Sequence, residues 1–162
     1  MIKGRKPGAA LDVGMGQGRN AVFLAQAGWI VTGFDPARKA VAVAIQSAKS
    51  SGVPLTTEIT TSELFDFGEN RWDLIVATYV TVREHAVKLQ KALKPHGVLV
   101  VEGYHRQATK GRGVGNGVVF DTGELINLFA DLRVVRYEEP LVIADFGKQT
   151  LRVVRYCGEK VE

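Results

Sequence analysis

Three glycines at alternate positions constrain this chain more than any other feature. Gly14, Gly16 and Gly18 follow an apolar run, and a helix-like stretch follows them. The run contains one acid, Asp12, two residues before the first glycine. Glycine has no Cβ, so the backbone can turn sharply there and a ligand can approach the main-chain amides. The spacing is not the G-x-G-x-x-G fingerprint of dinucleotide sites, because Arg19 stands where that fingerprint has its third glycine.

Apolar runs alternate with helix-like stretches along the chain, which is typical of a parallel sheet wrapped by helices. The expected strands are residues 9–13, 29–34, 54–60, 72–77 and 98–102, and the expected helices are residues 19–27, 37–49, 83–93 and a short one that ends at 130. We expect Asp121 or Thr122 to cap the short helix. Two near-identical segments, residues 132–137 and 151–156, predict two antiparallel strands at the sheet margin.

These elements together define the predicted fold class. It is α/β, with a doubly wound, Rossmann-like, mostly parallel seven-stranded sheet that ends in an antiparallel hairpin and carries helices on both faces. In such a sheet a ligand lies beyond the carboxyl ends of the strands, where the strand order reverses. We therefore expect the loops after residues 13, 34, 60, 77 and 102 to line one pocket.

The size and composition of the chain favour a single domain over residues 1–162. No apolar run approaches the ~20 residues that span a bilayer, so no membrane segment is expected, and no secretory signal is evident. Cys157 is the only cysteine, which excludes an internal disulfide, and we predict a cytoplasmic location. We attribute the formal charge of +4 to scattered surface lysines and arginines rather than to a nucleic-acid site.

Three segments together resemble the class I S-adenosylmethionine-dependent methyltransferases: residues 11–21, residues 33–35 and residues 93–99. Within that family, residues 18–21 and the pair Tyr104-His105 resemble the small-molecule branch, which includes tellurite-resistance-type and thiopurine-type enzymes. The resemblance covers nearly the whole chain. It implies S-adenosylmethionine as the cofactor and a small-molecule acceptor that attacks the methyl carbon in line.

The resemblance also assigns residues to the cofactor. It implies that the backbone of the glycine turn contacts the methionine part, and that Asp12 orients the amino group of that part. Asp35 is expected to accept hydrogen bonds from the ribose hydroxyls, to cap a helix ahead of Pro36, or to do both. The residues that we expect to bind the cofactor are Asp12, Gly14, Met15, Gly16, Gly18, Asp35, Pro36, Thr61, Ser62 and Thr78.

The loop after the third strand departs from the family. Many relatives have an aspartate there that accepts a hydrogen bond from the adenine amine, whereas this chain has Thr61 and Ser62. An uncharged hydroxyl is the weaker acceptor. The alternative is that main-chain amides hold the adenine, with apolar packing from Pro36, Leu64 and Phe65.

The loop after the fourth strand, which starts at Thr78, leads to the methyl group in the resembling family. It lacks the Asn- or Asp-Pro-Pro-aromatic tetrad of amino-methylating DNA and protein enzymes. Cys157 is far in sequence from the place where cytosine-C5 enzymes have their nucleophile. Methylation of DNA bases is therefore not expected.

Tyr104 and His105, after the fifth strand, are the candidates for catalysis. His105 is either a general base, since imidazole titrates near neutral pH, or a plain loop histidine. We expect His85 and His96 at the surface. The histidines show no ligand spacing, so no metal site is predicted.

Relatives usually have one or two helices before the glycine turn, which cover the cofactor and help to shape the acceptor pocket. Only about ten residues precede the first strand here, so we expect an open pocket, a cover supplied by a second copy or a partner chain, or a fragment. Other functions stay open. These are a non-catalytic protein that binds S-adenosylmethionine or S-adenosylhomocysteine, an RNA methyltransferase, and an NAD-dependent oxidoreductase, which the glycine spacing disfavours. The scaffold does not name the acceptor.

Overall fold

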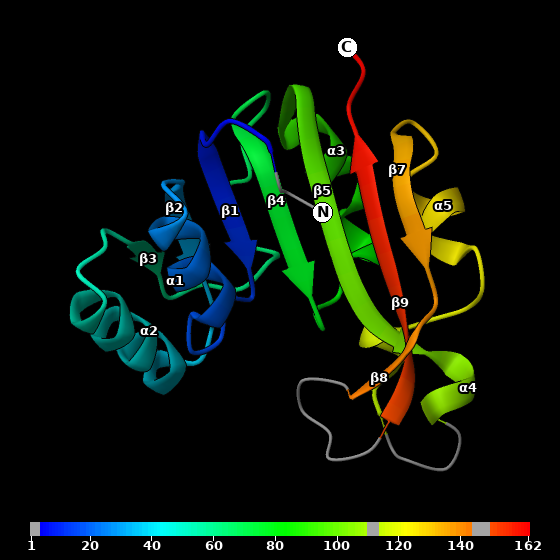
Figure 1. Cartoon of the computed structure of the whole chain (residues 1–162), viewed down its shortest axis with the longest axis horizontal. Coiled ribbons are helices and arrows are strands. Elements are labelled where there is room, and N and C mark those ends of the chain that lie inside the picture. The colour runs from blue at the N-terminus through cyan, green and yellow to red at the C-terminus, as the bar shows by residue number, and fades with distance from the viewer. Residues whose placement is uncertain (1–3, 110–113, 144–149) are drawn as a thin grey trace.

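The computed structural model describes residues 4–109, 114–143 and 150–162. In this part of the chain one sheet forms, and seven of its strands lie in the order β3-β2-β1-β4-β5-β9-β7 (Figure 1). Their bounds are β1 (Ala9–Val13), β2 (Ile30–Phe34), β3 (Thr56–Glu58), β4 (Trp72–Thr78), β5 (Leu93–His105), β7 (Arg133–Glu138) and β9 (Thr150–Glu159). Two short strands lie off this path: β6 (Val119–Phe120) pairs with β5, and β8 (Leu141–Ile143) pairs with β9.

The first five strands of the path are parallel, and β9 runs antiparallel to both β5 and β7. The chain starts at β1, moves outward to β3 and then returns to β4 on the other side of β1, so the strand order reverses between β1 and β4. The predicted mostly parallel, seven-stranded sheet with an antiparallel hairpin is confirmed. A ligand site is expected at this point of reversal.

The two near-identical segments form β7 and β9, which pair with Tyr137 opposite Tyr156. The predicted antiparallel pairing is therefore confirmed. The two strands are the last two of the sheet, so their predicted place at the sheet margin is confirmed as well. Because β9 pairs with β5 on its inner side, β7 alone is the edge strand.

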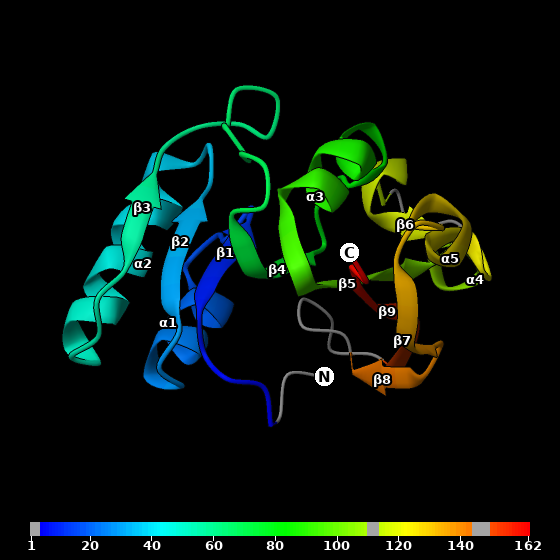
Figure 2. The same ribbon diagram turned by 90° about the horizontal axis from the view of Figure 1, so that it is seen from above.

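Helices lie on both faces of the sheet, as predicted. Figure 2 shows α1 and α2 on one side, beside β1, β2 and β3, and α3 and α5 on the other side. Figure 1 looks onto the α1 and α2 face, and no helix lies in front of β5 and β9 there. Among the described residues, no helix is both long and apolar enough to cross a bilayer. The bounds are α1 (Arg19–Gln26), α2 (Arg38–Ser50), η1 (Arg83–His85), α3 (Ala86–Ala92), α4 (Arg106–Thr109), η2 (Asn116–Val118) and α5 (Glu124–Leu128).

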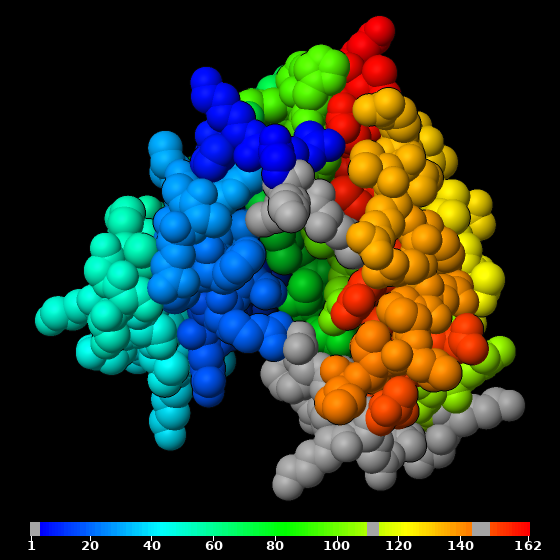
Figure 3. All heavy atoms as spheres, viewed as in Figure 1, coloured from blue at the N-terminus to red at the C-terminus, as the bar shows by residue number. Residues whose placement is uncertain are grey.

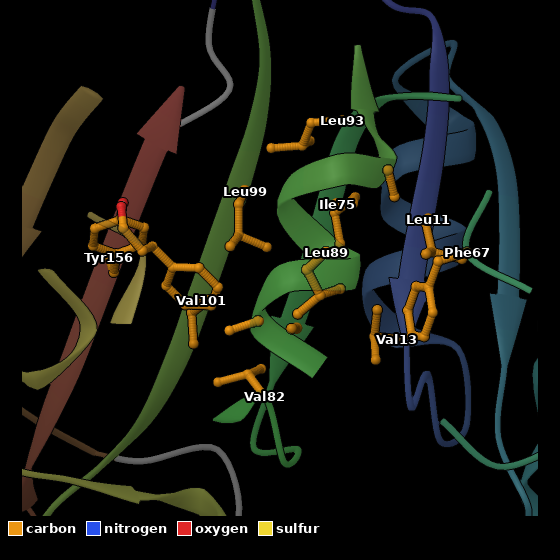
Figure 4. Packing of buried hydrophobic residues seen from close by; sticks show 14 of the residues in the cluster. Leu11, Val13, Phe67, Ile75, Val82, Leu89, Leu93, Leu99, Val101 and Tyr156 are labelled. Carbon is orange, nitrogen blue, oxygen red and sulfur yellow. The ribbon is translucent and has the colours of Figure 1, made fainter. Parts of the chain in front are cut away.

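The pleat of the strands divides the buried apolar side chains into two clusters, because successive residues point to opposite faces. Members of the cluster on the α3 and α5 face include Leu11, Ile75, Leu89, Leu99 and Tyr156 (Figure 4). Members of the cluster on the α1 and α2 face include Ala10, Leu24, Leu74, Val98 and Cys157. By the same alternation, Asp12, Glu102 and Arg155 belong to the α1 and α2 face.

The strand β5 is longer than the predicted strand at residues 98–102. At its start Leu93 pairs with Trp72 of β4, and at its end Tyr104 pairs with Val119 of β6. These partners are distant in the sequence, so the local apolar pattern did not indicate the extension. The consequence is that β5 carries Tyr104 within the sheet rather than in a loop.

The start of α5 also differs from its prediction. The helix begins after Gly123, whose φ is 74°, and no side chain caps it. Asp121 and Thr122 therefore do not have the predicted capping role. Instead, the carboxylate of Glu124 accepts a hydrogen bond from the amide of Asp121 at 2.8 Å, which ties the first turn back to the preceding segment.

Candidate functional site

The glycine turn lies between β1 and α1, where the strand order reverses. Gly14, Gly16 and Gly18 have φ angles of 60°, 54° and 78°, a region that favours glycine. A Cβ on Gly14 would lie 2.4 Å from Cγ1 of Val80, and a Cβ on Gly18 would lie 2.6 Å from Cβ of Ala44. At Gly16 a Cβ would meet nothing within 4 Å. Packing therefore requires Gly14 and Gly18, whereas Gly16 presents bare backbone to open space.

Met15 points away from that space. Its side chain is buried, and its Sδ lies 2.3 Å from where a Cβ on Gly33 would be. Its amide donates to the carbonyl of Phe34, and its carbonyl accepts from the amide of Gly18, both at 2.9 Å. Met15 thus holds the turn against β2, and the predicted cofactor contact concerns its main chain at most.

Asp35 follows β2 and lies beside the turn. Its Oδ2 accepts a hydrogen bond from the amide of Gly16 at 2.9 Å, and its Oδ1 accepts one from the amide of Ala37 at 2.8 Å. The carboxylate therefore ties the glycine turn to the residue before α2. The helix begins after Ala37 and no side chain caps it, so Asp35 does not have the predicted capping role. A carboxylate offers about four acceptor positions, so this half-buried group can still accept from ligand hydroxyls. Pro36, the next residue, is exposed.

Asp12 is a buried acid in β1, and its side chain belongs to the α1 and α2 face of the sheet. Only 1% of the residue is exposed, and its Oδ2 has no hydrogen-bond partner in the described part of the chain. Desolvation raises the pKa of Asp12 to about 7, and the amide of Ala21 and the charge of Arg19 oppose that rise. A cationic ligand group would satisfy the orphaned oxygen and restore the charged form. The site therefore fits the amino group of S-adenosylmethionine.

The loop after β3 contains Thr61 and Ser62, both half-buried. The carbonyl of Thr61 accepts hydrogen bonds from the amides of Leu64 and Phe65, so the segment forms a tight turn. A hydrogen bond from the Thr61 hydroxyl lowers the pKa of Glu63. The hydroxyl that we expected at the adenine is thus engaged with a neighbouring carboxylate.

The apolar residues of the same region divide into two kinds. Phe65 is buried and stacks on Phe34, with 4.2 Å between ring centroids, so it belongs to the core. Leu64 is 80% exposed, and Pro36 is exposed as well. Of the three residues that we expected to pack on adenine, only Leu64 and Pro36 present free apolar surface.

His85 is buried, so its predicted surface position is wrong, whereas His96 is exposed as predicted. The Nε2 of His85 lies 3.9 Å from Oε1 of Glu63, and its ring centroid lies 6.0 Å from that of Phe67. These contacts come from the loop before β4, which folds over η1. Among the described residues, no three potential metal ligands gather at one place.

Thr78 ends β4, and its Oγ1 accepts a hydrogen bond from Nδ2 of Asn20 on α1 at 3.0 Å. Tyr79 follows with a φ of 56°. The phenol of Tyr79 donates to Oε1 of Glu102 at 2.7 Å, and its amide donates to the carbonyl of Glu102 at 2.8 Å. The sequence had indicated Thr78, but no role was predicted for Tyr79 or Glu102, although an aromatic residue directly after the fourth strand was a visible signal.

Tyr104 and His105 lie on opposite faces of β5. The ring of Tyr104 lies 4.8 Å from that of Tyr79, on the side of the glycine turn. His105 is buried on the other face, where its Nδ1 accepts from the amide of Gln107 and its Nε2 lies 3.0 Å from Oγ1 of Thr122. The structure brings Tyr104 to the candidate site but not His105, whose role as a base stays a prediction.

Comparisons with known proteins agree with this geometry. A family model described as a methyltransferase domain matches residues 10–97, more than half of the chain. A ubiquinone biosynthesis O-methyltransferase of Paramagnetospirillum magneticum is 35% identical over 105 residues, which cover 60% of this chain and 41% of that protein. Hemagglutinin 1 of Eikenella corrodens is 29% identical over 140 residues, or 82% of this chain and 46% of that protein. The chain thus spans less than half the length of these relatives.

Solved structures share the fold. The crystal structure of TehB from Haemophilus influenzae superposes with a TM-score of 0.83 at 18% identity, covering 98% of this chain and 59% of that one. At this identity the likeness concerns the fold, and the family assignment comes from the sequence model. From that match, the sheet order and the glycine turn, we conclude that this chain belongs to the class I S-adenosylmethionine-dependent methyltransferase family, whose cofactor is S-adenosylmethionine.

Proposed function

We propose that this chain transfers a methyl group from S-adenosylmethionine to a small-molecule acceptor. The observation that carries the proposal is the unpartnered, buried oxygen of Asp12 in β1, together with the open backbone of Gly16 in the turn that follows β1. Together they match a ligand that has a positive amino group and must lie against main chain. When bound, S-adenosylmethionine supplies a methyl group on a positively charged sulfur.

The residues of the chain have separate tasks in this proposal. Asp12 holds the amino group, and Asp35 accepts from the ribose hydroxyls with the acceptor positions that Gly16 and Ala37 leave free. Thr61 and Ser62, with Pro36 and Leu64, bound the adenine. The protein mainly aligns the two reactants, and well-oriented pairs reach effective molarities of about 10⁵–10⁸ M.

Two observations favour a small acceptor. One relative is named an O-methyltransferase of ubiquinone biosynthesis. In addition, each arginine of β7 and β9 forms an ion pair with a glutamate, which offsets the positive charge that a phosphate backbone would meet there. These pairs are Arg133 with Glu159, Arg136 with Glu138, Arg152 with Glu139, and Arg155 with Glu102. The RNA alternative predicts salt-dependent RNA affinity, which filter binding tests.

Calorimetry and label transfer test the proposed function. We expect the full chain to bind S-adenosylmethionine and S-adenosylhomocysteine, and to move radiolabel from the methyl group of the former to compounds in a panel of small phenols, amines and thiols. Lack of binding would overturn the cofactor site. Binding without transfer to any compound would favour the non-catalytic alternative.

We also propose that a second copy or a partner chain covers the α1 and α2 face over β5 and β9. The support is that no helix lies over these strands in the described part of the chain (Figure 1). Light scattering with and without S-adenosylhomocysteine measures the oligomeric state. A monomer with full transfer activity would contradict this part of the proposal.

A further inference from the structure

A polar row crosses the sheet beside the end of β4. Thr78, Glu102, Arg155 and Glu138 are register partners on four neighbouring strands, β4, β5, β9 and β7. Figure 3 shows a hollow on this face, with the green of β4 and β5 in its floor and the orange of β7 at its side. The row thus starts at the end of β4, the predicted position of the methyl group, and lies on the strands that floor and flank this hollow.

The centre of the row is the carboxylate of Glu102. Its Oε2 accepts a hydrogen bond from Nε of Arg155 at 2.5 Å, and Arg155 also contacts Glu138 at 3.5 Å. The other oxygen, Oε1, accepts from the phenol of Tyr79 at 2.7 Å. Arg155 therefore fixes the carboxylate in one orientation, with its second oxygen directed at Tyr79.

The backbone of Tyr79 has a conformation that is uncommon for a bulky side chain. A φ of 56° is strained for a bulky side chain, and such residues cluster at functional sites. The strained turn directs the ring over β5, where the phenol reaches Glu102 and the ring approaches that of Tyr104 at 4.8 Å. This turn thus places the hydroxyl of Tyr79 beside Glu102 and its ring beside that of Tyr104.

We propose that this hollow binds a neutral phenol as the methyl acceptor, with Tyr79 and Glu102 as its proton-accepting pair. The inference rests on the proposed function and names its acceptor class. The acceptor ring packs against Tyr104, because aromatic rings associate in offset or tilted arrangements. Its hydroxyl donates to Oη of Tyr79, whose own proton already points to Glu102.

The proton balance of this step is complete. The phenol oxygen forms the bond to the methyl carbon, the carbon–sulfur bond breaks, and its electron pair stays on sulfur. The acceptor proton moves to Oη of Tyr79, and the Tyr79 proton moves to Oε1 of Glu102. A neutral phenol is a weak acid with a pKa near 10, but its oxygen becomes strongly acidic as the methyl bond forms, so a carboxylate is a sufficient base late in the reaction.

The test compares two probes on four variants. The first probe is phenol, which is neutral at about pH 8, and the second is 4-nitrophenol, which is largely ionised at that pH. The variants are Tyr79→Phe, Glu102→Gln and Glu102→Asp, with Tyr137→Phe as the matched control. Tyr137 also donates to a glutamate, Oε1 of Glu139, but lies on the α3 and α5 face of the sheet.

We expect Tyr79→Phe and Glu102→Gln to lower kcat for phenol by about 10²- to 10³-fold, with little change in KM. The loss with 4-nitrophenol should stay under about tenfold, because that acceptor arrives without its proton. Glu102→Asp should restore part of the phenol activity. In Glu102→Gln the rate with phenol should rise with pH as the phenol ionises. Tyr137→Phe should behave as the wild type with both probes.

Calorimetric titration with S-adenosylhomocysteine should give similar affinities for all variants, since the hydrogen bond between Tyr79 and Glu102 is separate from the bond between Asp35 and Gly16. Equal losses with both probes, full activity of Tyr79→Phe, or no transfer to either probe by the cofactor-bound wild type would overturn this inference. Lack of cofactor binding by the wild type would instead overturn the proposed function, so the two failures are distinguishable.

Discussion

The carboxylate of Asp35 accepts a hydrogen bond from the main-chain amide of Gly16 at 2.9 Å. The end of the second strand thereby fixes the conformation of the turn after the first strand. The two parts of the predicted cofactor site, the glycine backbone and the ribose carboxylate, are thus coupled before any ligand binds. This coupling means that a change at Asp35 acts on both parts.

Replacing Asp35 by alanine should weaken cofactor binding without unfolding the domain. The loss of charged hydrogen bonds to the ribose should cost about 1.5–3 kcal/mol of binding, or tenfold or more in Kd. Loss of the bonds to Gly16 and Ala37 should lower the free energy of unfolding by about 1–2 kcal/mol. Calorimetry with S-adenosylhomocysteine and urea unfolding measure the two effects. An unchanged affinity would contradict the ribose role.

Asp12 should make the stability of the domain depend on pH. Its pKa is about 7 in the folded chain against 3.8 as the ordinary value. Between these values the folded chain holds a proton that the unfolded chain lacks, so the free energy of unfolding falls as pH rises from about 4 to about 7. The full shift corresponds to roughly 4 kcal/mol. Asp12→Asn should remove this dependence in urea unfolding at a series of pH values.

The same carboxyl group should release a proton when the cofactor binds. At pH 6 most of the free protein carries a protonated Asp12, and the ammonium group of the ligand favours the ionised form. Calorimetry in buffers of different ionisation enthalpy should therefore show release of up to one proton, and none in Asp12→Asn. Equal proton release by the wild type and by Asp12→Asn would contradict the role of Asp12 as the partner of the amino group.

Two glycines of the turn should respond differently to alanine. Gly18→Ala places a Cβ 2.6 Å from Cβ of Ala44, and that clash plus the positive φ should destabilise the fold by roughly 2–4 kcal/mol. Gly16→Ala meets no protein atom, so only the backbone cost of roughly 1–2 kcal/mol applies. Its new methyl group instead enters the space left for the cofactor. Urea unfolding measures the stability of both variants. Calorimetry with S-adenosylhomocysteine should show the larger loss of affinity in Gly16→Ala.

Neighbouring residues in the loop after β3 offer a matched pair. Phe65→Ala removes a ring stacked on Phe34 in the core and should cost about 3–5 kcal/mol of unfolding free energy. Leu64→Ala changes an 80% exposed side chain and should cost under about 0.5 kcal/mol. Urea unfolding measures both. If Leu64→Ala lowers cofactor affinity without changing stability, the adenine contact gains support.

The sequence predicted the elements whose signals are local. The strand β1 matches its prediction at both ends, because an apolar run stops at a glycine turn. The doubly wound, mostly parallel sheet and its antiparallel end followed from the alternation of elements and from the family resemblance. The positions of Asp12 and Asp35 beside the turn also followed, since both stand at the carboxyl ends of neighbouring parallel strands.

Features that depend on distant partners were missed. The burial of His85 is due to Phe67 and Glu63, which come from another loop, so its own helix gave no sign of it. The hydrogen bond between Tyr79 and Glu102 depends on the pairing of β4 with β5, in which Glu102 lies opposite Thr78. A single sequence does not show which residues of two strands lie opposite each other. The separation of Tyr104 from His105 became visible only when β5 was found to extend through both residues.

The contact between Met15 and Gly33 limits how this turn can vary among related chains. Any side chain at position 33 would enter the volume that the thioether sulfur fills, 2.3 Å from the position of a Cβ. Alanine at position 33 should therefore be accompanied by a shorter residue at position 15, and the two sites should change together. A larger residue at position 33, without a smaller one at position 15, would displace the glycine turn from β2 and would disturb the backbone that the cofactor is expected to contact.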